Sequence, residues 1–246
     1  MSRPHILLCP QFTEVEWAIA PQLSEWAEVA TFDSPGVGNE PVPGGELKGF
    51  DRGIAVARAL KEVEDRGWDS YFVVGDGWGT ATAARVAAEK PERVRGVALS
   101  HATLHHDGEG ERPAINAEVV AAMTQLMRSD SESFVRYGLT QFTLGGFDEN
   151  HAARMVERFP DMDVAGKVWE MLLEEREHIG ELLGQLDVPL LLCRHKDCLV
   201  FTPEGFEDAA GAFPDAQTID VGTAPPASDE FAAALRDFCE GVIPAR

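Results

Sequence analysis

Short apolar runs alternate with amphipathic stretches in the first part of the chain. Four runs have the length and composition of buried strands: His5–Cys9, Val29–Asp33, Ser70–Val74 and Val94–Ser100. Apolar residues at helical spacing between them predict helices over Phe50–Gly67 and Thr80–Lys90. Strands that alternate with helices predict an α/β fold, with a mostly parallel sheet flanked by helices.

The pattern then changes to successive helices without a convincing strand, from about residue 104 to residue 187. Strands resume with the apolar run Val188–Cys193 and with residues 216–221, and an amphipathic helix closes the chain. We therefore predict a first core segment at 1–103, an inserted all-helical cap at 104–187 and a second core segment at 188–246. A cap in this place is expected to cover a site on the core.

The amino-acid composition and net charge of the chain argue against some classes of function. Hydrophobic residues make up 44% of the chain and charged residues 26%, as in a globular protein, and the net charge is -21. Such an acidic surface repels phosphate backbones, so we expect no nucleic-acid partner, although an acidic docking face for another protein stays possible. Four cysteines without zinc-type or CxxC spacing, and no run of ~20 apolar residues, predict a cytoplasmic protein outside the membrane.

Four stretches occur in an order that resembles the α/β-hydrolase superfamily. They are "FDSPGVGNE" at 32–40, "VVGDGWGTATAARVAAEKPERVRGVALS" at 73–100, the segment 186–221, and "DEFAAALRDFC" at 229–239. In that superfamily a G-x-nucleophile-x-G turn joins a strand to a helix and projects the reactive side chain above the sheet. The matching residues here are "GDGWG" at 75–79, and the tryptophan makes them most similar to epoxide hydrolases and haloalkane dehalogenases.

The resemblance places Gly77 where the nucleophile is expected, and glycine has no reactive atom. Asp76 precedes it by one residue, so this carboxylate is either a displaced nucleophile or a hydrogen-bonding group within the turn. The triad acid is matched by Asp197, which follows the predicted strand Val188–Cys193. No histidine occurs in "VGTAPPASDEF" at 221–231, where Ala224 stands nearest the expected place. A cap histidine, His151 or His178, is the remaining way to fill that gap.

Two backbone donors and one further histidine complete the candidate site. The resemblance implies that the N–H groups of Gln11 and Trp78 bind a carbonyl oxygen or an anion, so that Gln11, Gly77, Trp78 and His101 are the candidate ligand-binding residues. His101 follows the strand Val94–Ser100 and is expected at the carboxyl edge of the sheet, where open α/β sheets bind ligands. There it is either a base oriented by Asp197 or Asp76, or a histidine bonded within its loop.

Other reactive residues carry less weight. The carboxylate of Asp197 beside Cys198 is expected to raise the pKa of that thiol. The adjacent residues His105, His106 and Asp107 form a poor chelate, so we expect neither a metal nor a cofactor.

Three functions follow. The leading one is a small, largely apolar molecule held between core and cap by a protein with a degenerate triad, without hydrolysis or with atypical chemistry. Methionine and aromatic residues at helical spacing in the cap suit such a ligand. The second is an active hydrolase, lyase or isomerase that uses His101, Asp76 or Asp197 in a non-standard arrangement. The third is a protein-interaction module, and a homodimer is compatible with each of them.

Overall fold

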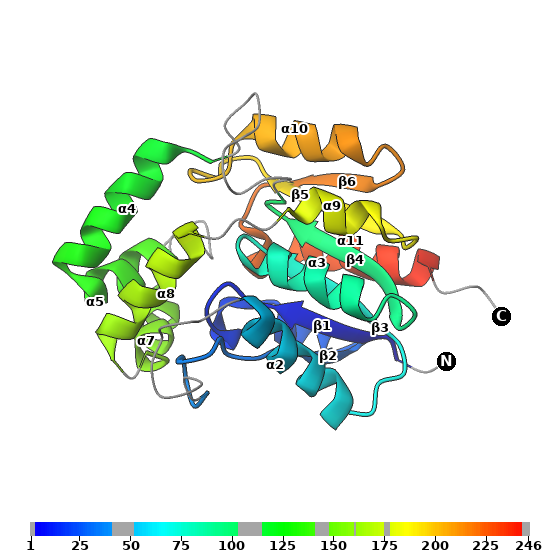
Figure 1. Cartoon of the computed structure of the whole chain (residues 1–246), viewed down its shortest axis with the longest axis horizontal. Helices are drawn as coiled ribbons and strands as arrows, with labels where there is room; N and C mark the ends of the chain where they lie inside the picture. The colour runs from blue at the N-terminus through cyan, green and yellow to red at the C-terminus, as the bar shows by residue number, and fades with distance from the viewer. Residues whose placement is uncertain are drawn as a thin grey trace.

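A six-stranded parallel sheet forms the centre of the protein in the computed structural model, which describes residues 3–40, 52–102, 115–140, 148–159, 161–174 and 178–242. The strand order is β2-β1-β3-β4-β5-β6 (Figure 1). The strands are β1 (His5–Cys9), β2 (Glu28–Ala30), β3 (Tyr71–Asp76), β4 (Val94–Ser100), β5 (Leu190–His195) and β6 (Gln217–Val221). The predicted α/β fold with a parallel sheet is therefore confirmed, and each predicted strand lies in its expected stretch.

Helices cover both faces of the sheet. One face packs against α2 (Arg52–Asp65), α3 (Gly79–Glu89), α9 (Ile179–Gly184) and α10 (Pro203–Ala212). The other face packs against α1 (Ala20–Leu23) and α11 (Asp229–Val242). The central strands β1 and β3 are mostly apolar because side chains on both of their faces are buried, as expected for a parallel sheet, whereas the edge strands β2 and β6 carry exposed polar residues.

The register of the strands decides which residues meet above the sheet. Cys9 on β1 is paired with Gly75 on β3, and Asp76 with Ser100 on β4. Ser100 is in turn paired with Cys193 on β5. The segments that follow these four strands therefore leave the sheet at one carboxyl edge, the usual place for a ligand in such folds.

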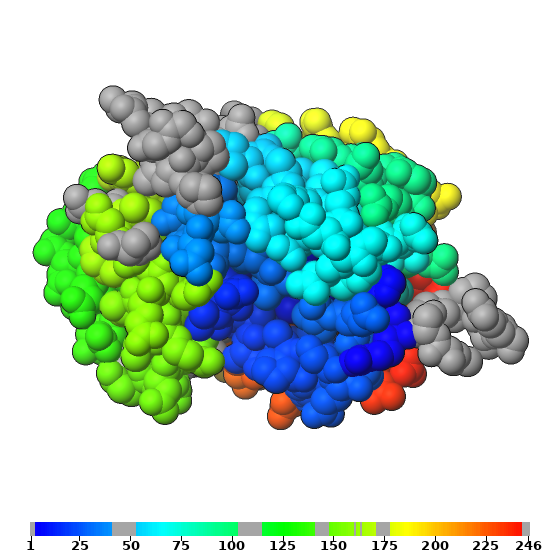
Figure 2. Space-filling view, turned by 90° about the horizontal axis from the view of Figure 1, so that it is seen from below, coloured from blue at the N-terminus to red at the C-terminus, as the bar shows by residue number. Residues whose placement is uncertain are grey.

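The remaining helices form one end of the molecule (Figures 1 and 2). They are α4 (Ala117–Ser129), α5 (Ser131–Ser133), a π-helical turn (Phe134–Leu139), α7 (Glu149–Glu157) and α8 (Met162–Glu174). Although α9 falls within the stretch predicted as a helical cap, it packs on α3 within the core layer. None of the helices in the described part of the chain is long and apolar enough to cross a membrane.

An ionic contact ties this helical end to the core. The guanidinium of Arg158, at the end of α7, bonds to Asp33 in the loop after β2 and lies 3.1 Å from Oε1 of Glu14. Asp33 is buried and also accepts hydrogen bonds from the hydroxyl of Thr13 and the backbone of Glu14. The N–H of Gly38 donates to the carbonyl of Arg158 at 2.6 Å. The helical end is therefore bonded to the core through both backbone and side-chain groups.

Candidate functional site

The turn after β3 has the glycine-dependent geometry that its sequence predicts. Gly77 has a φ of 51°, in the left-handed region, and its N–H donates to the carbonyl of Ser100 at 3.1 Å. Its carbonyl accepts from both the N–H and the hydroxyl of Thr80 in the first turn of α3. A Cβ on Gly79 would lie 2.3 Å from the carbonyl oxygen of Cys9. The glycines thus allow α3 to start directly above the end of β1.

The Asp76 carboxylate lies beside this turn and is 2% exposed. Oδ2 accepts a hydrogen bond of 2.8 Å from the side-chain amide of Gln11. Oδ1 accepts one from the hydroxyl of Ser100 and one of 3.0 Å from Nδ1 of His101. Donors on both oxygens fix the orientation of the carboxylate. The alternative of a buried, hydrogen-bonded carboxylate is what the geometry of Asp76 shows.

His101 is the first residue after β4, and this place fixes its position above the carboxyl edge of the sheet. Its φ is 57°, and among the described residues it is the one non-glycine residue with a positive φ. Such backbone conformations are uncommon for residues with a side chain and gather at functional sites. Its ring is buried, bonded to Asp76, and stacked on Phe201 with 5.0 Å between the ring centroids. His101 therefore points its second ring nitrogen away from Asp76.

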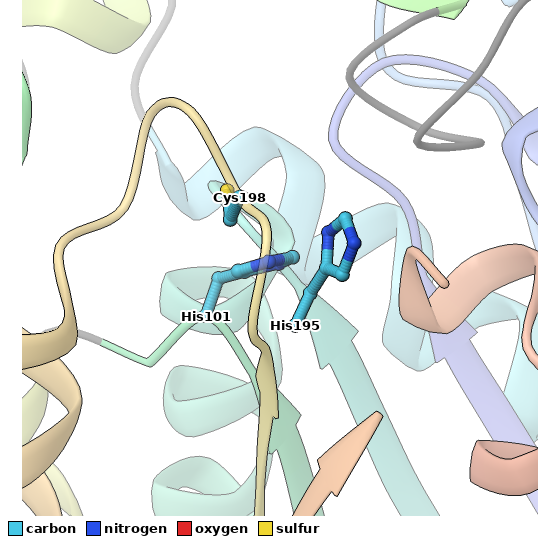
Figure 3. Close-up of side chains that lie close together, drawn as sticks. All are labelled: His101, His195 and Cys198. Atoms are coloured by element: carbon cyan, nitrogen blue, oxygen red, sulfur yellow. The ribbon is translucent and has the colours of Figure 1, made fainter. Parts of the chain in front are cut away.

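His195, the last residue of β5, and Cys198 on the turn after it complete a cluster with His101 (Figure 3). One ring nitrogen each of His101 and His195, and Sγ of Cys198, all lie within 4.8 Å of one another. A turn brings Cys198 back over the strand end, with its N–H donating to the carbonyl of His195 at 3.3 Å. The groups come from adjacent strands of the sheet, β4 and β5. An acid, a base and a thiol thus follow one another above the carboxyl edge.

The charges of the cluster support each other. Burial would raise the pKa of the Cys198 thiol, but its interactions with His101 and His195 lower that pKa to about 6. Burial would likewise lower the pKa of His101, but its interactions with Asp76 and Cys198 raise that pKa to about 10. Near neutral pH the pair is therefore a thiolate and an imidazolium. The expectation that Asp197 raises the pKa of Cys198 is wrong, because the carboxylate is exposed whereas the two imidazoles contact the sulfur.

The remaining triad candidates lie apart from this cluster. Asp197 faces solvent on the turn after β5, and Ala224 is buried just before a short 3₁₀ turn. His178 is exposed at the start of α9, and His151 is buried in α7, where burial lowers its pKa. The second histidine of the cluster is His195, which sequence reasoning did not single out. The "HKDC" pattern at the end of the penultimate strand was the available signal.

The backbone donor expected at Gln11 is already used. Its N–H donates to Oε2 of Glu16 at 2.8 Å, and the N–H groups of Phe12 and Thr13 donate to Oε1 at 2.8 and 2.9 Å. Glu16 is 1% exposed, and burial raises its pKa to about 8. The expectation that the Gln11 N–H binds a ligand is therefore corrected, since a carboxylate of the same chain occupies it. The expectation for the N–H of Trp78 stays a prediction.

Aromatic side chains fill the junction between the helical end and the core. Trp78 is buried edge-on to Trp169 of α8, with ring centroids 5.0 Å apart, and 6.0 Å from Phe201. Phe134 contacts Trp169 from the opposite side at 5.0 Å. Through Phe201 this row of rings reaches His101. Cap residues predicted to pack or to face a ligand therefore belong to one apolar cluster above the elbow.

A small hollow lies beside the cluster. His101 and His195 line it together with Lys196, Phe201 and Thr202, among others. Sulfur and imidazole nitrogen are also common donors for metal ions, and the cluster is a compatible donor set among the described residues. The earlier metal candidates His105, His106 and Asp107 lie outside the described residues.

Comparison with known proteins supports the fold. A family model for the alpha/beta hydrolase fold matches residues 4–225. No curated protein matches the sequence of the chain.

Three solved structures illustrate the likeness in fold. The enol-lactonase from Burkholderia xenovorans LB400 has a TM-score of 0.71 at 17% identity, over 99% of this chain and 92% of that one. The 2-hydroxy-6-oxo-6-phenylhexa-2,4-dienoate hydrolase from Rhodococcus sp. strain RHA1 has a TM-score of 0.74 at 17% identity, over 99% and 91%. A hydrolase from Oleispira antarctica has a TM-score of 0.74 at 15% identity, over 98% and 92%. By its sheet, its elbow and the family match over most of its length, the chain belongs to the alpha/beta hydrolase fold family.

Proposed function

We propose that this protein is a hydrolase of acyl compounds in which the thiol of Cys198 is the nucleophile. His101 is the acid–base residue and Asp76 the carboxylate that orients it. The observation that carries the proposal is the continuous set in which Oδ1 of Asp76 bonds Nδ1 of His101 and the other side of that ring faces Sγ of Cys198. A nucleophile, a base and a group that orients the base form the general arrangement for covalent acyl transfer.

The first half of the reaction follows from the ionic state of the pair. The Cys198 thiolate attacks the carbonyl carbon of an ester or thioester, a carbon–sulfur bond forms, and the carbonyl electron pair moves to oxygen. When that pair returns, the bond to the leaving group breaks, and the imidazolium of His101 gives its proton to the leaving atom. The product of this half is an acyl group bound to Cys198, and His101 is neutral.

Water completes the cycle. Neutral His101 takes a proton from a water molecule, whose oxygen attacks the acyl carbon. The carbon–sulfur bond then breaks, releasing a carboxylic acid and restoring the thiolate and the imidazolium. Asp76 holds the ring of His101 in one orientation throughout, and its hydrogen bond to Nδ1 stabilises the imidazolium form.

The residues of the elbow at 75–79 support the proposal that the nucleophile lies elsewhere. Gly77 offers no heteroatom, and the side-chain amide of Gln11 occupies the space next to its Cα. The Gln11 N–H, a donor expected to bind a substrate oxygen, is bonded to Glu16. A reaction centred on Gly77 would need groups that these residues do not supply, whereas the Cys198 cluster holds a nucleophile and a base in contact.

A second candidate function is retention of a small apolar molecule between core and cap without turnover. The row of buried aromatic rings from Phe134 to Phe201 favours this function. If the helical end moved away from the core, these rings would line an apolar binding surface. Here Cys198 would have no catalytic role. A docking role of the acidic surface, a homodimer and a cytoplasmic location remain predictions from the sequence.

Hydrolysis of p-nitrophenyl acetate and S-phenyl thioacetate by the wild type, Cys198→Ala and Cys198→Ser tests the proposal. We expect turnover by the wild type, a loss of about 100-fold or more in both variants, and an acetyl group on the Cys198 peptide by mass spectrometry. A fluorophosphonate probe is expected to leave residues 75–79 unlabelled. Unchanged turnover in Cys198→Ala would overturn the proposal. So would a wild type without turnover whose Cys198 reacts with iodoacetamide no faster than glutathione does.

A chelator separates thiol catalysis from metal chemistry at the same cluster. Dialysis against EDTA is expected to leave both the turnover and the acetylation of Cys198 unchanged. Activity that disappears with EDTA and returns with zinc would instead assign the sulfur as a metal ligand and contradict its role as nucleophile.

A further inference from the structure

The side chain of Gln11 lies in the space that a side chain at position 77 would need. A Cβ built on Gly77 would be 2.6 Å from Oε1 of Gln11 and 2.9 Å from Nε2. Both distances are shorter than real Cβ contacts, and Gln11 is 1% exposed, so its amide has little room to move aside. Glycine at position 77 is therefore the residue that the presence of Gln11 requires.

Gln11 uses that space to bond to Asp76. Nε2 of Gln11 donates to Oδ2 of Asp76 at 2.8 Å, while Ser100 and His101 donate to Oδ1. An ionised carboxylate only accepts hydrogen bonds, so the amide nitrogen faces it. With one oxygen held by Gln11 and the other by two donors, the carboxylate cannot rotate without losing a charge-assisted bond.

The backbone of Gln11 is held as firmly as its side chain. Glu16 accepts from its N–H at 2.8 Å and from the next two N–H groups along the chain. The hydroxyl of Ser34 lies 3.4 Å from the Gln11 carbonyl oxygen. Because the backbone of Gln11 is fixed at the end of β1 in this way, its side-chain amide holds Asp76 in a defined position.

We propose that Gln11 is a positioning residue for the Cys198–His101 pair, acting through Asp76 from the space of the missing side chain at position 77. The inference rests on the proposed function of Cys198. Gly77 is then part of the site, because the absence of a side chain there leaves room for the Gln11 amide that orients Asp76.

Gln11→Leu removes the donor while keeping a similar volume, and Gln22→Leu on the exposed face of α1 is the matched control. The readout is the rate of iodoacetamide alkylation of Cys198 against pH, by mass spectrometry of the peptide. We expect the midpoint to rise by roughly half to one pH unit in Gln11→Leu, because Asp76 then loses the hydrogen bond that holds it towards His101. We also expect a fall of about 10-fold in kcat on p-nitrophenyl acetate with KM unchanged. Gln22→Leu is expected to match the wild type.

Thermal unfolding of a double-mutant cycle tests the steric part without reference to activity. Gly77→Ala is expected to lower Tm in the Gln11 protein, and to lower it less in Gln11→Ala, where the clash with the amide is absent and only the strain of the left-handed backbone at position 77 remains. The same loss in both backgrounds would overturn the assignment of the space to Gln11.

The outcomes for Gln11 and for Cys198 are distinguishable. A folded Gln11→Leu with wild-type midpoint and kcat, beside a wild type whose Cys198 is reactive, overturns the role of Gln11 and leaves the proposed function intact. A wild type whose Cys198 has the pH midpoint and rate of free cysteine overturns both, since there is then no activated pair to position.

Discussion

Nδ1 of His101 lies 3.0 Å from Oδ1 of Asp76, with both side chains buried and the two residues 25 positions apart in the chain. This contact links the turn after β3 to the segment after β4. It keeps a proton on His101, and the charged ring in turn stabilises the thiolate of Cys198. The chemistry of the site therefore depends on groups that occupy neither the nucleophile nor the histidine position of the resembled family.

The pH dependence of Cys198 alkylation is the first prediction. The pKa of the thiol is lowered to about 6 and that of His101 is raised to about 10. As pH rises, thiolate forms through pH 6, and the imidazolium is lost only near pH 10. The alkylation rate is therefore expected to rise around pH 6 and to be level from pH 7 to 9. Cys239, whose pKa burial raises to about 12, is the internal control and should stay unreactive over this range. A rise centred near pH 9 would contradict the ion pair.

Two aspartates can be compared directly as the orienting acid. Asp76→Asn removes the charge that faces His101, and we expect kcat on p-nitrophenyl acetate to fall by about 100-fold or more. Asp197→Asn changes an exposed side chain beside Cys198 and is expected to alter kcat less than about two-fold. The reverse order of effects would restore Asp197 as the acid that the family resemblance implies.

Arg158 is expected to stabilise the contact between helical end and core. Arg158→Ala leaves the buried Asp33 without its guanidinium partner, and we expect a loss of about 1–2 kcal/mol in the free energy of unfolding. The control is Arg128→Ala, because Arg128 and Glu170 form an exposed pair, 3.1 Å apart, whose loss should cost about 0.5 kcal/mol or less. Urea unfolding followed by circular dichroism measures both. Equal losses would mean that Arg158 is merely another surface charge.

Glycines 79 and 211 make opposite predictions. A Cβ at Gly79 meets the backbone carbonyl of Cys9, so Gly79→Ala is expected to cost about 2 kcal/mol or more, because the start of α3 must move away from β1. A Cβ at Gly211 in α10 meets nothing within 4 Å, so Gly211→Ala should raise stability by about 0.5 kcal/mol through helix propensity. The Tm of each variant is compared with that of the wild type. Equal Tm values for the two variants would contradict both predictions.

Several elements follow from local sequence alone. The strand β4 at Val94–Ser100 and the helix α3 have nearly the predicted bounds, because a continuous apolar run and a run of small residues each favour one structure over a short distance. The elbow was also predictable, since Gly75 and Gly79 lie close to neighbouring backbone and Gly77 has a left-handed backbone conformation. The place of α9 was not predictable, because a helical pattern does not show whether a helix packs with the cap or, as here, on α3 in the core layer.

The candidate site was only partly accessible from the sequence. His101 and Asp76 were both expected at the carboxyl edge, and they meet there. Cys198 was set aside because its neighbour in sequence is acidic. The pKa of Cys198 is instead lowered by the imidazoles of His101 and His195. The sequence does not show that these two side chains lie next to the sulfur, because His101 is far from Cys198 along the chain. Glu16 was missed for the same reason, because its partners are backbone groups that converge only in the folded loop.

The sequence by itself determined the strands, most of the helices and the glycine turn, because hydrophobic period and backbone conformation are local properties. Only the tertiary structure decided that Gln11 fills the space beside Gly77 and that Asp76, His101 and Cys198 adjoin one another. These contacts exist because β1, β3, β4 and β5 are neighbours in the sheet, and the register of their pairing sets which side chains meet above its edge.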